Sequence, residues 1–447
     1  MTKSPHIESS AVLTDILSDE QIVKLAIQSE FQQRAPKKIF PAIFARQLLS
    51  EAISHSPSYN DLAASMEKDT GISVSKQAIC ERVDESCVRF VESILAKVIS
   101  AQISPHLLSN NKRHDLLCQR MLVQDSTVLR LPLQLFNTFS GVSNAHKSVC
   151  NARVQCVYDL MDENFVHFSI DSYSKNDIAA APQLQLRHGD LVLRDRGYLS
   201  TGEIQRHVDA GADCIYRHKT RTIYFDTQTS EVFPLAAKLK RDGQLDCQVL
   251  LNNDRRTSVR LVAVPVNEET ANLRRMKAKR ECKGHAPSKK VLALMAWTIF
   301  ITTIPPERAS FDDLLNIYGL RWRIENIFKT WKSNMSFAAI HNVSEHQLRS
   351  IIIARLIALV AIFHRIYAPL RHRVCTIFAK HLSMMKLLRY LQVNQERIAP
   401  LLLLAAGRLH DESLLAAIAR YCVYDSRKKR LNYTQMQEKV FTRMALP

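Results

Sequence analysis

The sequence predicts an α/β protein in which a layered central part is flanked by helical regions at both ends. Apolar residues recur with helical periodicity over roughly the first 110 positions. From about residue 119, short apolar runs alternate with turn residues, which is typical of strands, and helical periodicity returns after about residue 340. A chain of 447 residues is longer than one compact core usually holds, so we expect several domains.

The N-terminal region, residues 1–112, contains a candidate helix-turn-helix motif at 59–83. Gly71 lies in the turn between two amphipathic stretches, and Ser75 is a suitable N-cap for the second helix. The second helix of such a motif enters a DNA groove. Because helix pairs joined by a glycine turn are common, a purely structural pair fits the pattern equally well. The side chains that would meet DNA are Ser73, Ser75, Lys76, Gln77 and Arg82.

Residues 113–212 form the first part of the predicted α/β layer. A helix is expected at 177–187, and the acidic turn 162–164 separates two of the strands. The expected strands are 121–124, 128–131, 152–160, 165–170 and 190–194.

Residues 213–292 are β-rich and very basic, and we expect them to interrupt the layer as an insertion. Between Glu268 and Lys290 there are eight Lys or Arg residues against three acidic ones. A strand at 291–302 resumes the layer, whose second part is 293–344, and the region 345–447 is helical. The strand candidates of the insertion are 214–216, 222–225, 248–251 and 259–265.

The charge balance indicates a polyanionic partner. There are 61 Lys and Arg residues against 43 Asp and Glu residues, which gives a net charge of +18. Nucleic acid is the commonest partner of so basic a protein, although a basic protein with no such role remains the alternative. No acidic residue occurs from Gln347 to Gln395, a stretch that contains eight Lys or Arg residues.

Cysteine usage and hydropathy favour the cytoplasm. The ten cysteines have no C-x2-C pair, which fits free thiols in a reducing compartment. The N-terminus lacks the apolar run of a signal peptide. The most apolar window, 351–363, is short and contains Arg355, so we expect a buried helix there and no membrane partner.

The stretch from Tyr318 to Lys332 has the pattern Y-x2-R-x3-E-x6-K. On one helix, Tyr318, Arg321, Glu325 and Lys332 would fall within a stripe about 60° wide. A carboxylate between cations and a phenol suits metal-assisted chemistry on a phosphate backbone. An amphipathic helix with its polar residues facing solvent explains the same pattern.

Two further acidic residues follow apolar runs. Asp125 and Asp195 each lie where a predicted strand ends, and Gly197 permits a tight turn beside the second. Strand-end carboxylates joined by one from a helix can hold Mg²⁺, which prefers hard oxygen ligands. Taken singly, each Asp is better explained as a turn or cap residue.

Together these motifs resemble the DDE transposases of insertion-sequence family four, over roughly residues 115–340. The signature residues are Tyr318, Arg321, Glu325 and Lys332, the D-x-G-Y element is Asp195, Gly197 and Tyr198, and the first Asp is Asp125, followed by Ser126 and Thr127. The resemblance implies a ribonuclease-H-like catalytic core with Asp125, Asp195 and Glu325 as catalytic metal ligands. The ion would be Mg²⁺, with Mn²⁺ as a substitute.

The resemblance also implies residues that touch DNA. Arg321 and Lys332 would hold phosphates, and Tyr318 would contact the terminal backbone. Trp297 would stack on a flipped base during hairpin formation, with core packing in a buried strand as the alternative. His146 and Lys147, just before the second strand, are further candidates for DNA contact, and an ordinary loop without such contact is the alternative.

The expected activity is cutting and joining of insertion-sequence ends by Mg²⁺-dependent phosphoryl transfer, with excision through a DNA hairpin. Double-stranded DNA would be the partner, and two protomers would act together in a bacterial, nucleoid-associated cytoplasmic complex, joined through 345–447. A transposase-derived protein that binds DNA without cutting it, or a stand-alone nuclease on the same fold, are the alternatives.

Overall fold

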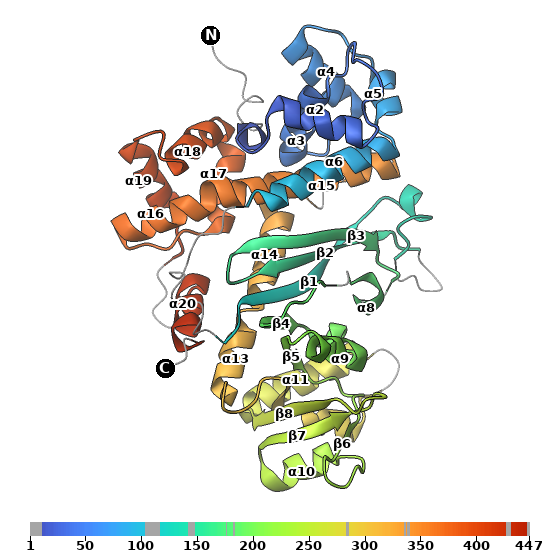
Figure 1. Ribbon diagram of the computed structural model, residues 1–447, viewed down its shortest axis with the longest axis vertical. Coiled ribbons are helices and arrows are strands. Elements are labelled where there is room, and N and C mark those ends of the chain that lie inside the picture. The colour runs from blue at the N-terminus through green and yellow to red at the C-terminus, as the bar shows by residue number, and fades with distance from the viewer. Residues whose placement is uncertain are drawn as a thin grey trace.

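The computed structural model describes residues 11–102, 117–141, 148–175, 177–181, 184–282, 286–334, 337, 340–425 and 431–444. His146 and Lys147 lie outside these ranges. The N-terminal helices lie at one end of the longest axis, and α10 (Leu235–Asp242) with the strands β6 (Tyr224–Phe225) and β7 (Leu245–Leu251) lies at the other (Figure 1).

The N-terminal region is helical, as predicted. Its helices are α2 (Asp19–Gln28), α3 (Pro41–Ser54), α4 (Tyr59–Thr70), α5 (Lys76–Arg82) and α6 (Glu85–Ser100). Gly71 ends α4 with φ of 68°, a left-handed conformation that glycine adopts without steric cost. The Ser75 hydroxyl caps α5 by accepting a hydrogen bond from the N–H of Ala78, 3.1 Å away. The predicted helix pair at 59–83 is therefore present, with the predicted turn and cap.

The centre of the molecule is one nine-stranded mixed sheet with the order β3-β2-β1-β4-β5-β9-β8-β7-β6. Strands β1, β4 and β5 are parallel, and all other neighbours are antiparallel. The α/β fold class is confirmed. The strands are β1 (Arg120–Arg130), β2 (Asn151–Asp159), β3 (Asn164–Ser172), β4 (Asp190–Arg194), β5 (Asp213–Arg217), β6 (Tyr224–Phe225), β7 (Leu245–Leu251), β8 (Ser258–Pro265) and β9 (Trp297–Thr302).

Local structure differs from the prediction in several places. The strands expected at 121–124 and 128–131 are one strand, because β2 pairs with β1 continuously as far as Arg130 and Asn151. The helix expected at 177–187 is the single turn α8 (Asp177–Ala180). The strand expected at 291–302 begins as helix α12 (Lys289–Leu294), capped by Ser288, and only its second half is β9.

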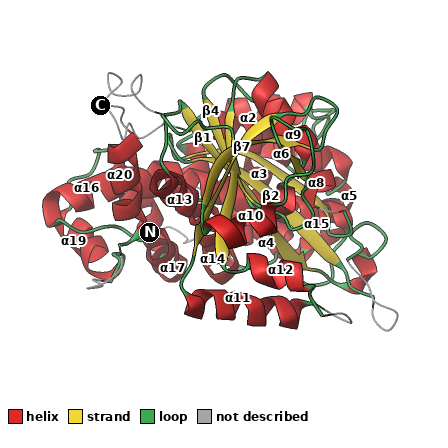
Figure 2. Cartoon of the chain, turned by 90° about the horizontal axis from the view of Figure 1, so that it is seen from below, coloured by secondary structure: helices red, strands yellow, loops and turns green. Residues whose placement is uncertain are grey.

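Helices cover both faces of the sheet (Figure 2). On one face, α13 (Phe311–Gly319) and α14 (Trp322–Asn334) pack against alternate strand residues such as Val123 and Leu193. On the other face, α9 (Thr201–Asp209), α10 (Leu235–Asp242) and α12 pack against the intervening residues, such as Leu122 and Val192. Because strand side chains alternate, Asp125 points to the same face as Val123, toward α14. Helix α11 (Glu268–Glu281) is mostly exposed and buries only Ala271.

The C-terminal region forms part of the core of the molecule. Helix α15 (Glu345–Ile362) packs against α3 and α6, and the buried Arg355 donates to the carbonyls of Ala52 and His55, both 2.9 Å away. The continuous helical segment Glu345–Phe378 is the one helix in the described ranges that is long and apolar enough to span a membrane. Its apolar window is 94% buried inside the protein, so the buried helix expected at 351–363 is confirmed. This region continues with the π-helical turn Phe363–Tyr367, α16 (Ala368–Phe378), α17 (Met384–Val393), the 3₁₀ turn Gln395–Arg397, α18 (Ile398–Ala405), α19 (Glu412–Tyr421) and α20 (Tyr433–Met444).

Candidate active site at the ends of the parallel strands

The sheet register places Asp125 and Asp195 side by side. The parallel pairing of β1 with β4 ends at Gln124 and Arg194. Asp125 directly follows Gln124, and Asp195 directly follows Arg194, so the two Asp residues occupy adjacent positions at the same edge of the sheet. The sequence had suggested that Asp125 ends its strand. This is wrong, because β1 continues beyond Asp125, paired with β2 alone. Asp125 lies where β1 leaves β4.

Asp125 is in an unusual environment for a carboxylate. Burial raises its pKa to about 6, and the N–H of Ser126, 2.8 Å away, and the Arg321 guanidinium act in the opposite direction. The negative charges of Glu325 and Asp195 raise the pKa further. All three predicted acidic residues are therefore close enough to act on one another, as clustered carboxylates do.

Glu325 reaches this cluster from α14, which is not continuous with the helix before it. The pattern Y-x2-R-x3-E-x6-K predicts one helix, but α13 ends at Gly319 and α14 begins at Trp322. At the junction, the N–H groups of Leu320 and Arg321 bond to carbonyls three residues earlier, as in a tight 3₁₀ turn. Arg321 therefore precedes the first turn of α14, and Tyr318 lies on α13.

The Arg321 guanidinium lies between two of the acidic residues. Its Nη2 is 2.5 Å from Oε1 of Glu325, and its Nη1 is 3.4 Å from Oδ2 of Asp125. The Arg321 side chain is only 9% exposed, so water screens these ion pairs weakly. One cation thus holds carboxylates from β1 and α14 together.

Tyr318 makes contacts that hold neighbouring parts of the site in position. Its hydroxyl donates to the carbonyl of Arg194, 3.3 Å away, and its ring lies 5.1 Å from that of Phe300 and 5.6 Å from the Arg321 guanidinium. Burial raises its pKa to about 12, the charge of Asp195 adds to this, and Arg321 and Arg217 act in the opposite direction. These are contacts within the protein that fix the end of β4.

The donor set suits a hard divalent cation, since it consists of carboxylate oxygens that converge on one edge. In their present positions, no three His, Cys, Asp or Glu side chains of the described ranges are arranged to hold an ion. At this edge Arg321 forms ion pairs with both Asp125 and Glu325. The carboxylate oxygens are the kind of ligand that a hard divalent cation takes.

The other predicted site residues are more widely spread. Lys332 is exposed, two helical turns beyond Glu325 on α14. Trp297 begins β9, is half-buried, and donates its indole N–H to the carbonyl of Gly243, 2.7 Å away. Lys76 and Gln77 are exposed on α5, which lies at the far end of the molecule in Figure 1.

The residues that precede the two Asp residues on their strands, Gln124 and Arg194, belong to a buried polar network that was not predicted. The Tyr198 hydroxyl donates to Oε1 of Gln155, 3.0 Å away, and Gln155 lies 3.5 Å from Nε2 of Gln124. Arg194 donates to Glu203 at 2.8 Å and to the Tyr216 hydroxyl at 3.4 Å. Gln124 and Gln155 are fully buried, and a glutamine within an apolar strand beside Asp125 was the sequence signal for them.

Arg217 is a second residue that sequence reasoning missed. It ends β5, the strand beside β4, and is half-buried. Its positive charge acts on Tyr318 and on Arg274, so it lies on the Tyr318 side of the site. A basic residue immediately after the apolar run 214–216 was the available signal.

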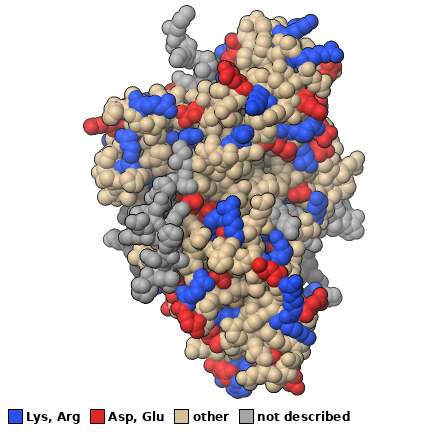
Figure 3. All heavy atoms as spheres, in the orientation of Figure 1, with Lys and Arg blue, Asp and Glu red and all other residues tan. Residues whose placement is uncertain are grey.

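The net positive charge is spread over the molecule. In the acid-free stretch 347–395, seven of the eight Lys and Arg residues are held by carboxylates or carbonyls of the protein, Arg389 being the eighth. On the face seen in Figure 3, Lys and Arg side chains are interspersed with Asp and Glu. Most cations of the acid-free stretch therefore have partners within the protein, and Arg355 and Arg371 are buried, so fewer of them are available to a polyanion than the sequence suggested.

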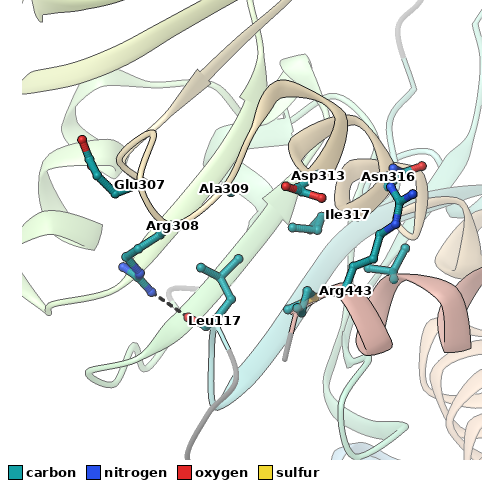
Figure 4. A pocket seen from close by; sticks show the side chains of 10 residues that line it. Leu117, Glu307, Arg308, Ala309, Asp313, Asn316, Ile317 and Arg443 are labelled. Atoms are coloured by element: carbon teal, nitrogen blue, oxygen red, sulfur yellow. Dashed lines mark hydrogen bonds between the residues drawn. The ribbon is translucent and has the colours of Figure 1, made fainter. Parts of the chain in front are cut away.

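A cavity of about 160 Å³ lies at the opposite end of β1 from Asp125, between α13 and α20 (Figure 4). Arg308, on its wall, pairs with Asp213 and donates to the carbonyl of Leu117, so this cation is already engaged. The cavity is separate from the carboxylate cluster. Its polar lining residues are Glu307, Arg308, Asp313, Asn316 and Arg443.

Comparison with known proteins shows the family of this chain. The transposase for insertion sequence element IS231D of Bacillus thuringiensis subsp. finitimus is 26% identical over 321 residues, covering 67% of each chain. The transposase for IS231B of Bacillus thuringiensis subsp. berliner is 25% identical over 323 residues with the same coverage. The transposase for IS1151 of Clostridium perfringens is 23% identical over 369 residues, 76% of each chain. The transposase DDE domain matches residues 117–361, which hold the nine-stranded sheet, Asp125, Asp195 and Glu325. With more than half of its length matched, this chain belongs to the transposase DDE domain family, and its core is ribonuclease-H-like.

Proposed function

We propose that this protein cuts DNA at the ends of an insertion sequence and joins those ends to a target by divalent-metal-dependent phosphoryl transfer. The observation that carries the proposal is the convergence of Asp125, Asp195 and Glu325 at one sheet edge, with Arg321 among them. Membership of the transposase DDE domain family, and likeness to insertion-sequence transposases, support the reaction class.

The three carboxylates would hold Mg²⁺, with Mn²⁺ as a substitute. When bound, such ions polarise phosphate oxygens and make a water or a 3′-hydroxyl more nucleophilic. The protein supplies rigidity: Asp125 is fixed by the N–H of Ser126, and the Asp195 turn is anchored through Arg194 and Tyr198. Rigid ligands lower the reorganisation needed at the reacting phosphate.

Cations around the cluster would hold the DNA backbone. Lys332 is exposed on α14, and Arg217 lies at the end of β5. Arg321 has the planar fork that suits a phosphate as well as a carboxylate. Tyr318 would act near the terminal phosphate by fixing the position of Arg194 through its hydrogen bond. Trp297, at the same edge of the sheet, would stack on a flipped base if excision proceeds through a hairpin.

Recognition of the element end is assigned to α5. Its Ser75, Lys76 and Gln77 are exposed on one side, as a groove-reading helix requires. Arg82 is engaged differently: it donates to the carbonyl of Phe31, 2.8 Å away, and lies over the Phe31 ring. We therefore assign DNA contact to Lys76 and Gln77 and a structural role to Arg82.

The remaining parts of the proposal concern organisation. Two protomers would act on two ends, since joining both to one target needs paired sites. The division into 1–112, 113–212, 213–292, 293–344 and 345–447 is kept as a functional division, with end binding in the first part. We place the protein in the bacterial cytoplasm, associated with the nucleoid.

The test is cleavage of a duplex that carries the terminal repeat flanking this gene, with Mg²⁺. Asp125→Ala, Asp195→Ala and Glu325→Ala should each abolish cleavage and leave end binding within a few-fold. Glu345→Ala is a matched control, because Glu345 is also 34% exposed and also pairs with an arginine one helical turn away, Arg349. Full cleavage by any of the three variants removes that residue from the site. Equal cleavage of any duplex would indicate a stand-alone nuclease, and binding without cleavage by the parent protein would indicate an inactive derivative.

A further inference from the structure

The position of Arg321 has a consequence for the order of binding. Its guanidinium contacts Glu325 Oε1 at 2.5 Å and Asp125 Oδ2 at 3.4 Å, and these residues come from different elements, α14 and β1. A divalent cation held by Asp125 and Glu325 would draw on the same two carboxylates that Arg321 now contacts. A guanidinium and a divalent cation repel each other at such short range and draw on the same negative charge, so each weakens the binding of the other.

We infer that Arg321 competes with the divalent cation for Asp125 and Glu325, and that a DNA phosphate which takes up Arg321 thereby raises the affinity of the site for the cation. The inference rests on the proposed function, because it takes these carboxylates to be the ligands.

The local structure permits this exchange. Arg321 lies in the two-residue junction between α13 and α14, so the direction of its side chain is determined by a turn and not by a continuous α-helix. Its Nε is buried without a hydrogen-bond partner in the described ranges, so the side chain is held mainly through its outer nitrogens. The Tyr318 ring lies 5.6 Å from the guanidinium and offers a surface along which it can move.

Thermodynamic linkage makes the exchange reciprocal. If phosphate binding frees the carboxylates, then DNA raises cation affinity by the same factor by which the cation raises DNA affinity. The protein would take up its ions mainly when an end is bound. Cleavage away from a correctly held end would then be suppressed by the same side chain that holds the phosphate.

The experiment measures Mn²⁺ affinity by electron paramagnetic resonance on the full chain, without DNA. Arg321→Gln should bind Mn²⁺ about tenfold or more tightly than the parent, since a hydrogen bond to a charged group is worth at least that factor. Arg321→Lys, whose ammonium cannot span both carboxylates, should give an intermediate gain and serves if the glutamine variant folds poorly. Arg217→Gln is the matched control, because it removes another cation near Tyr318 that forms no ion pair with a carboxylate of the described residues.

The outcomes are separable. An equal gain in Arg217→Gln means that overall charge, and not competition, sets the affinity, and this overturns the inference. No gain in Arg321→Gln also overturns it, while loss of binding in Glu325→Gln would still support the proposed ligands. Unchanged binding in Asp125→Asn and Glu325→Gln removes the proposed site itself.

A second arm adds the terminal-repeat duplex, with ions bound by DNA subtracted using Glu325→Ala protein. The duplex should tighten Mn²⁺ binding by the parent and leave Arg321→Gln unchanged. Equal tightening in both proteins would contradict the exchange.

Discussion

The Tyr318 hydroxyl donates a hydrogen bond to the main-chain carbonyl of Arg194, 3.3 Å away, and Arg194 is followed directly by Asp195. The contact joins the end of β4 to α13, across 124 residues of sequence. A side chain of the sequence signature therefore reaches the second Asp through the backbone. Its effect on chemistry would be exerted by position alone.

We predict that Tyr318→Phe slows cleavage of the terminal-repeat duplex and leaves duplex binding unchanged. Loss of one buried hydrogen bond costs about 1 kcal/mol of stability, which is too small to unfold the protein. Tyr367→Phe is the control, because the Tyr367 hydroxyl donates to the Leu382 carbonyl at the same 3.3 Å, far from the carboxylates. If both variants cleave at the parental rate, the Arg194 contact has no part in catalysis.

A leucine at position 297 should separate two roles of the indole. Trp297→Leu keeps apolar packing but removes the base-stacking surface and the N–H bond to Gly243. We expect the first nick to persist and hairpin formation to be slowed, as seen on denaturing gels. Proportional slowing of both steps, or of neither, would identify Trp297 as a packing residue.

Lys76→Ala should weaken binding of the terminal repeat and lower the slope of log affinity against log salt by about one unit. Gln77→Ala should leave the slope unchanged and alter the preference among repeat sequences, because an uncharged amide reads bases and does not neutralise phosphates. Lys24→Ala, an exposed lysine on α2, is the control. Identical slopes for Lys76→Ala and the parent would place the DNA elsewhere.

Acidification should destabilise the protein through His207. Burial lowers the pKa of His207 to about 4, below its ordinary value near 6.5, and its ring packs against Tyr216. The unfolded chain therefore binds a proton that the folded chain excludes, so stability is lost as pH falls from about 6.5 toward 4. Between pH 7 and pH 5 the loss should be on the order of 1–2 kcal/mol. His207→Phe should reduce this loss in urea denaturation at the two pH values, and an unchanged loss would exclude His207 as its source.

Removal of α20 should destabilise the catalytic core. Tyr433, Val440 and Phe441 are buried, and Gln437 donates to the carbonyl of Leu160, 3.0 Å away. A chain that ends at residue 431 should lose several kcal/mol, since each large buried side chain contributes about 2–5 kcal/mol. The measurements are soluble yield and thermal midpoint, with Val393→Ser, at a 76% exposed position, as the control. A truncated chain with the parental midpoint would contradict the packing.

The packing of α15 against α3 and α6 determines how contact between protomers must be tested. The region 345–447 is expected to join protomers, but deleting it would also expose the faces of α3 and α6 that α15 covers. Substitution of residues on its exposed surface, such as Val393 or Tyr421, is the usable test.

Local signals in the sequence were sufficient for the parts of the fold that local chemistry determines. Strand β4 was predicted residue for residue, because its apolar run is bounded by polar groups on both sides. Gly71 and Ser75 predicted a turn and a cap for the same reason. The adjacency of Asp125 and Asp195 depends on register, which the sequence did not contain, and only the resemblance indicated it.

Some of the misses arise from partners that lie elsewhere in the sequence, and others from local turns that periodicity does not reveal. β1 continues past Asp125 because β2 pairs with it, and the break between α13 and α14 leaves the hydrophobic periodicity unchanged. The cations of 347–395 suggested a DNA surface, whereas Arg355 is held by Ala52 and His55, and Arg371 by Glu163. Periodicity cannot reveal which charges find such partners.

The burial of α15 between the N-terminal helices and the rest of the protein has a consequence for biosynthesis. During translation, the apolar faces of α3 and α6 leave the ribosome roughly 250 residues before the segment that covers them. Contacts so distant in the chain form slowly, and exposed apolar faces favour association in the meantime. Unless a chaperone protects the nascent chain, the yield of active protein should depend on how fast residues 100–345 are synthesised.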